Sequence, residues 1–542
     1  MLDQWPILSL IAFSPLIGIA ALLFIPRDRG DWIKRAGFAA TLIPLVLATW
    51  LYIDFRKDAP GYQYEEKATW LRIDLNEEMA SMQQVDRIYY QFDYNMAVDG
   101  ISMPLVFLTA LISSMAALAA FGLKKRWKAF YILFLLLEIG MFGVFMAKDL
   151  LLFFLFFELT LVPAFFLIGI WGLEEREKAA NQFLLYNGIG SAVMIIAFLI
   201  LINTAGFSTV GIGSSAGSGE TALTYSGSVD VIRDNLESGT SMVNYDPGGL
   251  GENPFYLSDG LRAALFLMLF VAFGIKLPVF PFHTWMVRVH AQAPPALVMI
   301  HAGILLKMGA YGLIRFGFGL LPDEAVRYAG LIAVLGVISV LYGAVIAFVQ
   351  REFRLVLAYS SISHMGIVLM GLAALNEIGL QGAVFQLVSH GLIAALFFLI
   401  VGSLYERTGT TQLEHLGGLA KSMPFMSAML LVAGLASLGL PGLSGFVSEL
   451  MAFIGIYGAR PAVAIVGALG LILAAAYVLR SVLRVTYGPI KAKFADLRDA
   501  RLVEAVPMII LFAFILLVGV YPAILYKTLQ PAIQQLVIQL GG

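Results

Sequence analysis

The chain has 542 residues, of which 60% are hydrophobic and 13% charged. Soluble domains are usually about 45–50% apolar and about 25% charged, so a soluble protein of this composition could not cover its surface with polar groups. The net charge of −1 provides no basic field that would attract nucleic acid. The absence of Cys excludes disulfides, thiolate-held iron–sulfur clusters and Cys-based zinc sites. The composition therefore predicts a membrane protein that carries no redox centre of its own.

Hydrophobic stretches long enough to cross a membrane recur along the whole chain. A helix needs roughly 20 apolar residues to cross a hydrocarbon core of about 30 Å, and the backbone must be helical because lipid offers it no hydrogen bonds. The first stretch has no basic residues in front of it, unlike a signal peptide, so we expect it to be retained. We predict an all-α membrane protein with fourteen spans, near residues 5–25, 33–53, 101–122, 130–147, 149–171, 180–202, 260–282, 296–318, 325–348, 355–373, 379–403, 424–456, 461–485 and 502–524.

Loops on the two sides of the predicted bundle differ in their content of basic residues. The loops on one side hold most of the Lys and Arg, whereas the short loops on the other side hold little beyond Lys148, Arg327 and Arg460. Short loops rich in Lys and Arg stay in the cytoplasm. We therefore expect a multi-pass protein of a bacterial inner membrane with both termini on the outer side. The basic loops hold clusters at 27–35, 124–128, 176–178, 351–354 and 491–501.

Two long polar insertions, 54–100 and 203–259, fall on the predicted outer side. Both carry more Asp and Glu than Lys and Arg. The second contains the Gly- and Ser-rich stretch 211–220, whose composition indicates flexibility. The sequence does not reveal the role of this insertion.

Two spans are interrupted by proline. In the seventh, Lys276 is followed by Leu-Pro-Val-Phe-Pro, and in the twelfth, residues 440–445 read Leu-Pro-Gly-Leu-Ser-Gly. Proline lacks a backbone donor and clashes with the preceding helical turn. Broken helices at matching positions of two halves are typical of inverted-repeat transporters. The breaks lie five spans apart, which predicts two inverted five-helix repeats, spans 4–8 and spans 9–13.

This pattern divides the chain into four parts. Residues 1–129 hold the first three spans and the outer loop 54–100. The first repeat is 130–323, with the outer insertion 203–259, and the second is 324–490. Residues 491–542 form the last span and a tail.

Ionisable residues in the middle of spans are the strongest functional signal. Each costs about 2.5–3.5 kcal/mol at a helix centre, so they should face the interior of the bundle. Burial moves the pKa of a lysine down and that of a carboxylic acid up, and histidine already titrates near neutral pH, so these residue types suit proton transfer. The set is Glu138, Glu158, Lys276, Lys307, His364, His390 and Glu449.

Structural roles stay open for several of these polar residues. Glu138 could belong to a buried structural ion pair. His283 and His290 lie near the predicted cytoplasmic end of span 7 and are interpreted as structural or as part of an entrance. The sequence leaves the role of His301 undecided. We predict that Lys276 and Glu158 form a coupled pair. We also predict a relay that runs in the order Lys276, Lys307, His364, His390 and Glu449, with Glu449 as the terminal proton site on the outer side.

Several motifs resemble those of respiratory complex I. They are FFELTLVPAFFLIGIWG, FPFHTWMVRVHAQAPP, AGILLKMGAYGLIRFG, YSSISHMGIVLMG, VSHGLIAALFFLIVGSLYERTGT and LPGLSGFVSELMAF. Over roughly residues 95–525 they resemble subunit M of bacterial NADH–quinone oxidoreductase, the class of mitochondrial chain 4. The outer insertions are not part of this resemblance.

The resemblance implies a fourteen-helix antiporter-like fold and a role for each central residue. It places Glu138 and Glu158 at the family's glutamates on helices four and five, and Lys276 and Lys307 at its lysines on helices seven and eight. It likewise places His364, His390 and Glu449 on helices ten, eleven and twelve. The chain departs from the pattern at Arg288, where relatives carry an acid, and at His301.

The resemblance also implies the setting of the protein. It would be a proton-translocating subunit of an NADH:quinone oxidoreductase, beside the L-, N- and K-type membrane chains and a peripheral arm that holds flavin, iron–sulfur clusters and the quinone site. We expect no cofactor and no metal on this chain. The alternatives are a subunit of a multisubunit sodium/proton antiporter, the membrane arm of a hydrogenase complex, and an assembly scaffold. The sequence does not identify the electron donor, the quinone, the transported cation or the proton stoichiometry.

Overall fold

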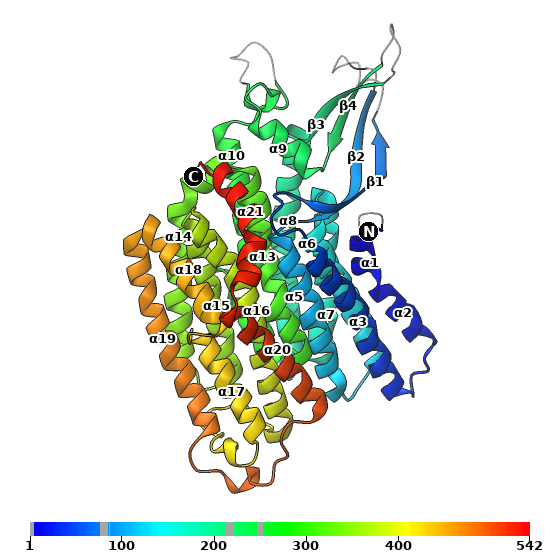
Figure 1. Cartoon of the computed structure of the whole chain (residues 1–542). Coiled ribbons are helices and arrows are strands. Elements are labelled where there is room, and N and C mark those ends of the chain that lie inside the picture. Colours follow the sequence, from blue (N-terminus) through cyan, green and yellow to red (C-terminus); the bar gives the residue numbers. More distant parts are fainter. Residues whose placement is uncertain (1–4, 76–84, 86, 213–219, 246–252, 542) are drawn as a thin grey trace.

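The structure, a computed structural model, describes residues 5–75, 85, 87–212, 220–245 and 253–541. Figure 1 shows a tall bundle of helices with a small β-sheet at one end. Twelve helices in these ranges are long and apolar enough to cross a membrane. Together with the broken seventh and twelfth spans they make the fourteen predicted crossings.

The crossings follow the predicted order with small shifts at their ends. The first six are α1 with α2 (Ile7–Phe13, Pro15–Phe24), α3 (Gly30–Asp54), α5 (Ser102–Ala119), α6 (Trp127–Met146), α7 (Leu150–Trp171) and α8 (Arg176–Thr204). The seventh is α10 (Asp259–Lys276) with α11 (Thr284–Gln292). The eighth is α12 (Pro295–Ile300), the π-helical turn η4 (His301–Leu305), α13 (Leu306–Gly312) and a second π-helical turn, η5 (Leu313–Phe318). The last six are α14 (Pro322–Val349), α15 (Phe353–Ala373), α16 (Glu377–Thr408), α17 with α18 (Pro424–Ser437, Ser444–Ala459), α19 (Pro461–Thr486) and α20 (Leu502–Val520).

The two breaks lie where the sequence predicts them. In span 7, α10 ends at Lys276 because Pro278 and Pro281 supply no backbone donor for a further turn. In span 12, Gly439 (φ +75°) and Gly442 (φ +91°) adopt the left-handed conformation that glycine tolerates, on either side of Pro441. The second half of span 7 continues to Gln292, ten residues beyond the predicted end at 282.

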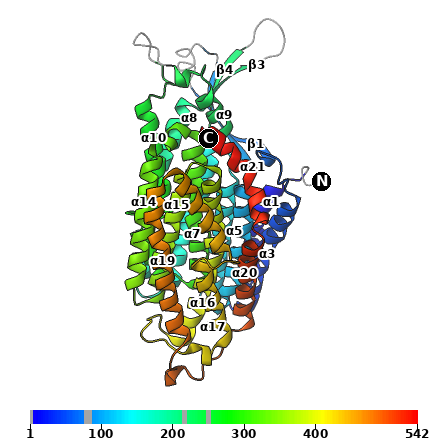
Figure 2. The same cartoon turned by 60° about the vertical axis from the view of Figure 1, so that its left-hand side comes forward.

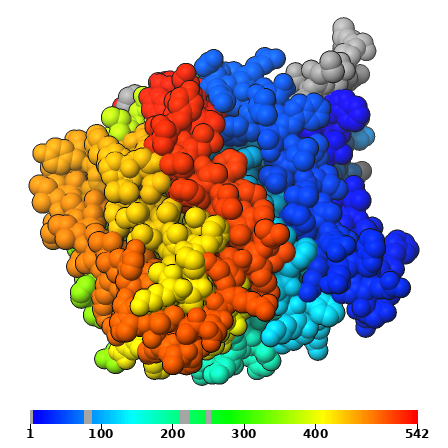
Figure 3. Space-filling model, turned by 60° about the horizontal axis from the view of Figure 1, so that its bottom comes forward, coloured from blue at the N-terminus to red at the C-terminus, as the bar shows by residue number. Residues whose placement is uncertain are grey.

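The tail after span 14 is helical and not irregular. Helix α21 (Ala523–Gln539) buries Leu525, Leu529 and Ile533, and it packs against α16. Figure 3, seen from the end opposite the sheet, shows the N-terminal spans on one flank and most of the C-terminal half on the other, with the C-terminal segment running between them. Figures 1 and 2 place the first and the last described residues toward the sheet end of the bundle.

The two outer insertions form one β-sheet, which the sequence analysis did not predict. Strands β1 (Gln63–Asp74) and β2 (Arg87–Val98) come from the first insertion, and β3 (Phe207–Ile212) and β4 (Glu220–Ser226) from the second. The strand order is β1-β2-β4-β3, antiparallel except for the parallel pair β2 and β4. The Gly- and Ser-rich residues 213–219, for which flexibility was predicted, lie outside the described residues.

The sheet has a small core of its own and is fixed to the bundle. Ile88, Leu223 and Phe255 are buried together in a second hydrophobic cluster. Lys148, at the sheet end of the bundle, pairs with Glu65 (3.1 Å) and Asp230 (2.6 Å) from the two insertions. Both insertions are therefore held against the same point of the bundle. The second insertion also contains the helix α9 (Val229–Glu237) and the short helix η3 (Met242–Asn244).

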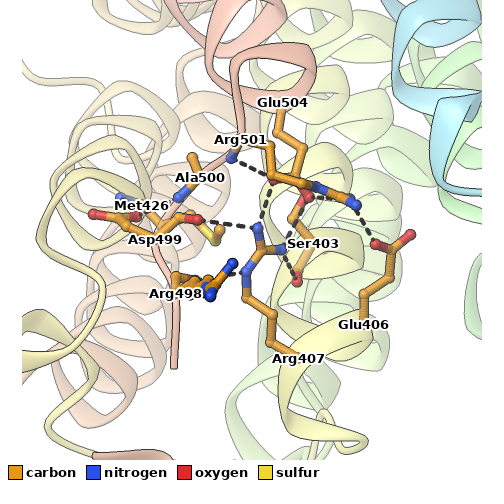
Figure 4. Close-up of polar contacts among 9 residues, drawn as sticks. All are labelled: Ser403, Glu406, Arg407, Met426, Arg498, Asp499, Ala500, Arg501 and Glu504. Carbon is orange, nitrogen blue, oxygen red and sulfur yellow. Dashed lines mark hydrogen bonds and ion pairs between the residues drawn. The ribbon is translucent and has the colours of Figure 1, made fainter. Parts of the chain in front are cut away.

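At the opposite end, Arg407 joins the end of α16 to the start of α20 (Figure 4). Its guanidinium donates two hydrogen bonds to the carboxylate of Glu504, at 2.9 and 2.6 Å. Its three other N–H groups donate to the carbonyls of Ser403, Arg498 and Asp499. All five N–H donors of this partly buried arginine are satisfied, which fastens the end of α16 to the start of α20.

Candidate functional site

Lys307 lies at the centre of the bundle, in α13 directly after the π-helical turn η4. Its side chain is fully buried. The ammonium donates to the carbonyl of Ala302, inside η4, and lies 2.7 Å from Nδ1 of His390 on α16. A π-helical turn has a wider hydrogen-bonding pattern than an α-helix and is often found at functional sites. Lys307 and His390 are thus in direct contact, although they are 83 residues apart in the chain.

The polar contacts continue from His390 to Glu449. The rings of His390 and His364 are neighbours, with centroids 5.3 Å apart. Nδ1 of His364 lies 3.4 Å from Oε1 of Glu449, which is 7% exposed and follows the break in span 12. Four of the seven predicted residues therefore form one continuous row in the order Lys307, His390, His364, Glu449.

Neutral polar side chains line this row. Nε2 of Gln386 lies 3.1 Å from Nδ1 of His364, and Ser448 donates to Oε1 of Gln386. Oγ of Ser437 lies 3.3 Å from Nε2 of His364. A cavity of about 10 Å³ beside both histidine rings has roughly the volume that one water molecule needs. These groups can orient the imidazoles and hydrate a passing proton.

Lys276 and Glu158 do not form a closed ion pair among the described residues. Lys276 is 1% exposed, and its ammonium has no hydrogen-bond partner there. It lies over the rings of Phe157 (4.9 Å to the centroid) and Phe183 (5.6 Å). Glu158 is half-buried, and its Oε1 is buried without a hydrogen-bond partner among the described residues. The ammonium of Lys276 and the carboxylate of Glu158 therefore lie apart in this structure, and their coupling stays a prediction.

Glu138, in α6, is fully buried, and neither carboxyl oxygen has a hydrogen-bond partner in the described part of the chain. Within the described ranges, Glu138 therefore makes no hydrogen bond to any of the other six predicted residues. The structure therefore does not support the structural ion pair that the sequence analysis left open for Glu138.

Two further histidines belong to the same buried region. Nε2 of His290, in α11, lies 2.9 Å from Nδ1 of His301, the first residue of η4, and both side chains are fully buried. From the sequence, His290 is predicted near a helix end, and the role of His301 is undecided. The two prolines before α11 hid how far span 7 continues, and the π-helical turn that carries His301 has no sequence signature.

Within the described ranges, no group of three or more His, Cys, Asp or Glu side chains is placed to hold a metal ion. The buried polar residues offer proton donors and acceptors to one another. A bundle of fourteen crossings with two broken helices and a central row of Lys, His and Glu has the architecture of an antiporter-like membrane subunit of an ion-translocating complex.

Comparison with known proteins agrees with this class. Residues 147–474 match the family described as NADH:quinone oxidoreductase/Mrp antiporter, transmembrane. The chain is 38% identical to NAD(P)H-quinone oxidoreductase chain 4 3 of Trichormus variabilis, over 97% of its own length and 90% of that protein's. It is also 38% identical to chain 4 1 of Synechococcus elongatus, over 96% and 89%. The chain belongs to this family, and both of these relatives are chain 4 proteins.

Solved structures show the same fold. A chain of respiratory complex I from Thermus thermophilus with bound NADH superposes with a TM-score of 0.79 at 27% identity, covering 99% of this chain and 100% of that one. A chain of an archaeal membrane-bound sulfane sulfur reductase gives 0.77 at 25% identity, covering 95% and 76%. A chain of the Mrp complex from Dietzia sp. DQ12-45-1b gives 0.77 at 19% identity, covering 99% of both chains, which shows a common fold alone.

Proposed function

We propose that this chain translocates protons in the membrane arm of an NADH:quinone oxidoreductase, through Glu138, Glu158, Lys276, Lys307, His364, His390 and Glu449. The observation that carries the proposal is the row of contacts from Lys307 through His390 and His364 to Glu449. A buried ion pair is a weak source of stability because desolvation offsets much of the attraction. A mixed row of two imidazoles between an ammonium and a carboxyl group is better suited to passing a proton.

The contacts favour an order that differs from the predicted relay, in which His364 came before His390. His390 touches Lys307, and His364 touches Glu449, so a proton leaving Lys307 meets the histidine of α16 before that of α15. The gap between Lys276 and Glu158 supports a switch role for this pair. When the opposite charge comes close, the lysine keeps its proton; when it moves away, the lysine releases it.

We also propose the predicted repeats, 130–323 and 324–490, and the predicted orientation. The broken spans 7 and 12 occupy matching positions in the two repeats, and spans 4 and 9 would begin on opposite sides of the membrane. The most basic loops lie at the end of the bundle away from the sheet, which favours a cytoplasmic location for that end. The sheet and both termini would then be outside, in a bacterial inner membrane.

The setting of the chain follows from its relatives. We propose that it works beside other membrane-arm subunits and a peripheral arm that carries flavin, iron–sulfur clusters and quinone. The 38% identity to chain 4 proteins over nearly the whole chain favours this assembly over a sodium/proton antiporter or a hydrogenase complex.

Replacement of Glu449 by Gln tests the proposal. Gln keeps the size of the side chain but cannot ionise, so electron transfer and proton pumping should fall together in the assembled complex. The assay is proton uptake into inverted membrane vesicles during quinone reduction, normalised to assembled complex on a native gel. Glu174→Gln, on an exposed cytoplasmic loop, is the matched control and should behave as the parent.

Two results would contradict the proposal. Full pumping by a correctly assembled Glu449→Gln variant would remove this residue from the pathway. Proton uptake that depends on sodium in the medium, in the parent protein, would favour the antiporter alternative.

A further inference from the structure

The row of contacts from Lys307 to Glu449 does not reach Lys276. Lys307 is joined to His390, but Lys276 has no hydrogen-bond partner among the described residues. If the lysines act in one pathway, as the proposed function requires, a proton needs carriers between the break in span 7 and the centre of span 8.

The His290–His301 pair lies in this gap. His301 and Lys276 border the same ring of Phe183, with the His301 ring 6.0 Å and the Lys276 ammonium 5.6 Å from its centroid. On the other side, the ammonium of Lys307 donates to the carbonyl of Ala302, which follows His301 in η4. The ring of His290 packs against Phe398 of α16, the helix that carries His390, with centroids 5.0 Å apart. The pair therefore lies beside Lys276 and next to the helical turn that Lys307 contacts.

The hydrogen bonding of the two rings suits proton transfer. One nitrogen of each ring is used in the bond between them, at 2.9 Å. The other two, Nε2 of His301 and Nδ1 of His290, are buried and have no partner in the described part of the structure. An unpartnered buried nitrogen costs free energy, so a purely structural histidine would be expected to use both.

We propose that His301, together with His290, is the proton link between Lys276 and Lys307, an inference that rests on the proposed function. With His301 as donor in the shared bond, a proton arrives at its Nε2, and the proton on its Nδ1 moves to Nε2 of His290. The proton on Nδ1 of His290 then leaves toward Lys307. One proton enters, one leaves, and no electron moves. The polarity of the shared hydrogen bond is reversed afterwards, so the rings must return to their first tautomers before the next transfer.

The test compares His301→Gln, which can still hydrogen-bond, with His301→Phe, which keeps an aromatic ring between Phe183 and Trp285. Neither can carry a proton. Positioned acid–base groups contribute roughly 10²–10⁴-fold, so both variants should lose roughly tenfold or more of the pumping rate per assembled complex. The double variant His290→Gln with His301→Gln should pump no more slowly than the more impaired of the two single variants, because the two histidines act in series.

The reference variant is Lys307→Met, measured in the same vesicles. If His301→Gln or His301→Phe pumps at the full rate per assembled complex while Lys307→Met is inactive, the histidine link is overturned and the proposed function is not. Losses that multiply in the double variant would place the two histidines on separate routes and would also overturn it. Full pumping by Lys307→Met would instead overturn the proposed function.

Discussion

Gly309 lies against the break in span 7, and replacing it by Ala should disturb the site without touching an ionisable group. A Cβ at this position would lie 2.6 Å from the backbone nitrogen of Leu277 and 2.6 Å from the carbonyl oxygen of Phe273. These two atoms form the last hydrogen bond of α10, 2.8 Å long, directly beside Lys276. Ordinary contacts begin at 3.4 Å, so α10 and α13 must separate by about 0.8 Å.

The expected effect follows from this displacement. Overpacking of a tight interior costs about 1–3 kcal/mol, and backbone atoms cannot rotate away as a flexible side chain can. A misplacement of about 1 Å can reduce a positioned reaction by about 10²-fold. Because Lys276 and Lys307 lie on the two helices that separate, Gly309→Ala should lower pumping far more than it lowers assembly.

The assay is the proton uptake of inverted vesicles together with the thermal stability of the solubilised complex. Gly188→Ala in α8 is the matched control, since nothing lies within 4 Å of its new Cβ. Alanine is favoured over glycine in a helix by about 1 kcal/mol, so the control should keep its activity and gain slightly in stability. Unchanged pumping and an unchanged melting temperature in Gly309→Ala would refute the reasoning.

Two further predictions concern residues outside the spans. For orientation, Thr240→Cys on the sheet side should react with an impermeant thiol reagent added from outside, and Ala495→Cys should react only from the cytoplasm. Both positions are exposed, and the parent protein has no Cys that could react instead. The reverse pattern would refute the proposed orientation. For pH dependence, burial raises the pKa of Asp149, the N-cap of α7, from 3.8 to about 6. Because the folded state binds this proton more tightly than the unfolded state, the contribution of Asp149 to stability should fall as pH rises from about 4 to about 6 and level off above. Asp149→Asn keeps a capping oxygen but cannot ionise, so the melting temperature of the complex should change less between about pH 4 and about pH 6 than it does in the parent. An equally steep change in the variant would contradict the raised pKa of Asp149.

The spans could be predicted because the membrane imposes one requirement on every residue of a span. Lipid excludes open backbone, so hydropathy alone locates helices such as α14 and α19. The broken helices were predictable for a similar reason, since Pro278 and Pro441 act on the backbone locally. Membership of the central site was also predictable, because a mid-span charge such as Lys307 must face inward.

The β-sheet was not predictable by the same reasoning. Strands β2 and β4 pair in parallel, Arg87 opposite Ala222, although spans 3–6 separate them in the chain. No local pattern encodes such a long-range pairing. The order of the site residues was hidden for a related reason. Which of His364 and His390 meets Lys307 depends on how α15 and α16 pack, and the His290–His301 contact depends on a π-helical turn.

The shared sheet constrains which part of the broken span 7 can move during turnover. Phe255, just before α10, is buried with Ile88 of β2, and β2 leads directly into α5. The end of α10 that lies nearest the sheet is thereby tied to the start of span 3. Any rearrangement at Lys276 that leaves the sheet intact must be taken up on the other side of the break, by α11. A spectroscopic label on α11 should therefore report motion during turnover that a label at the start of α10 does not.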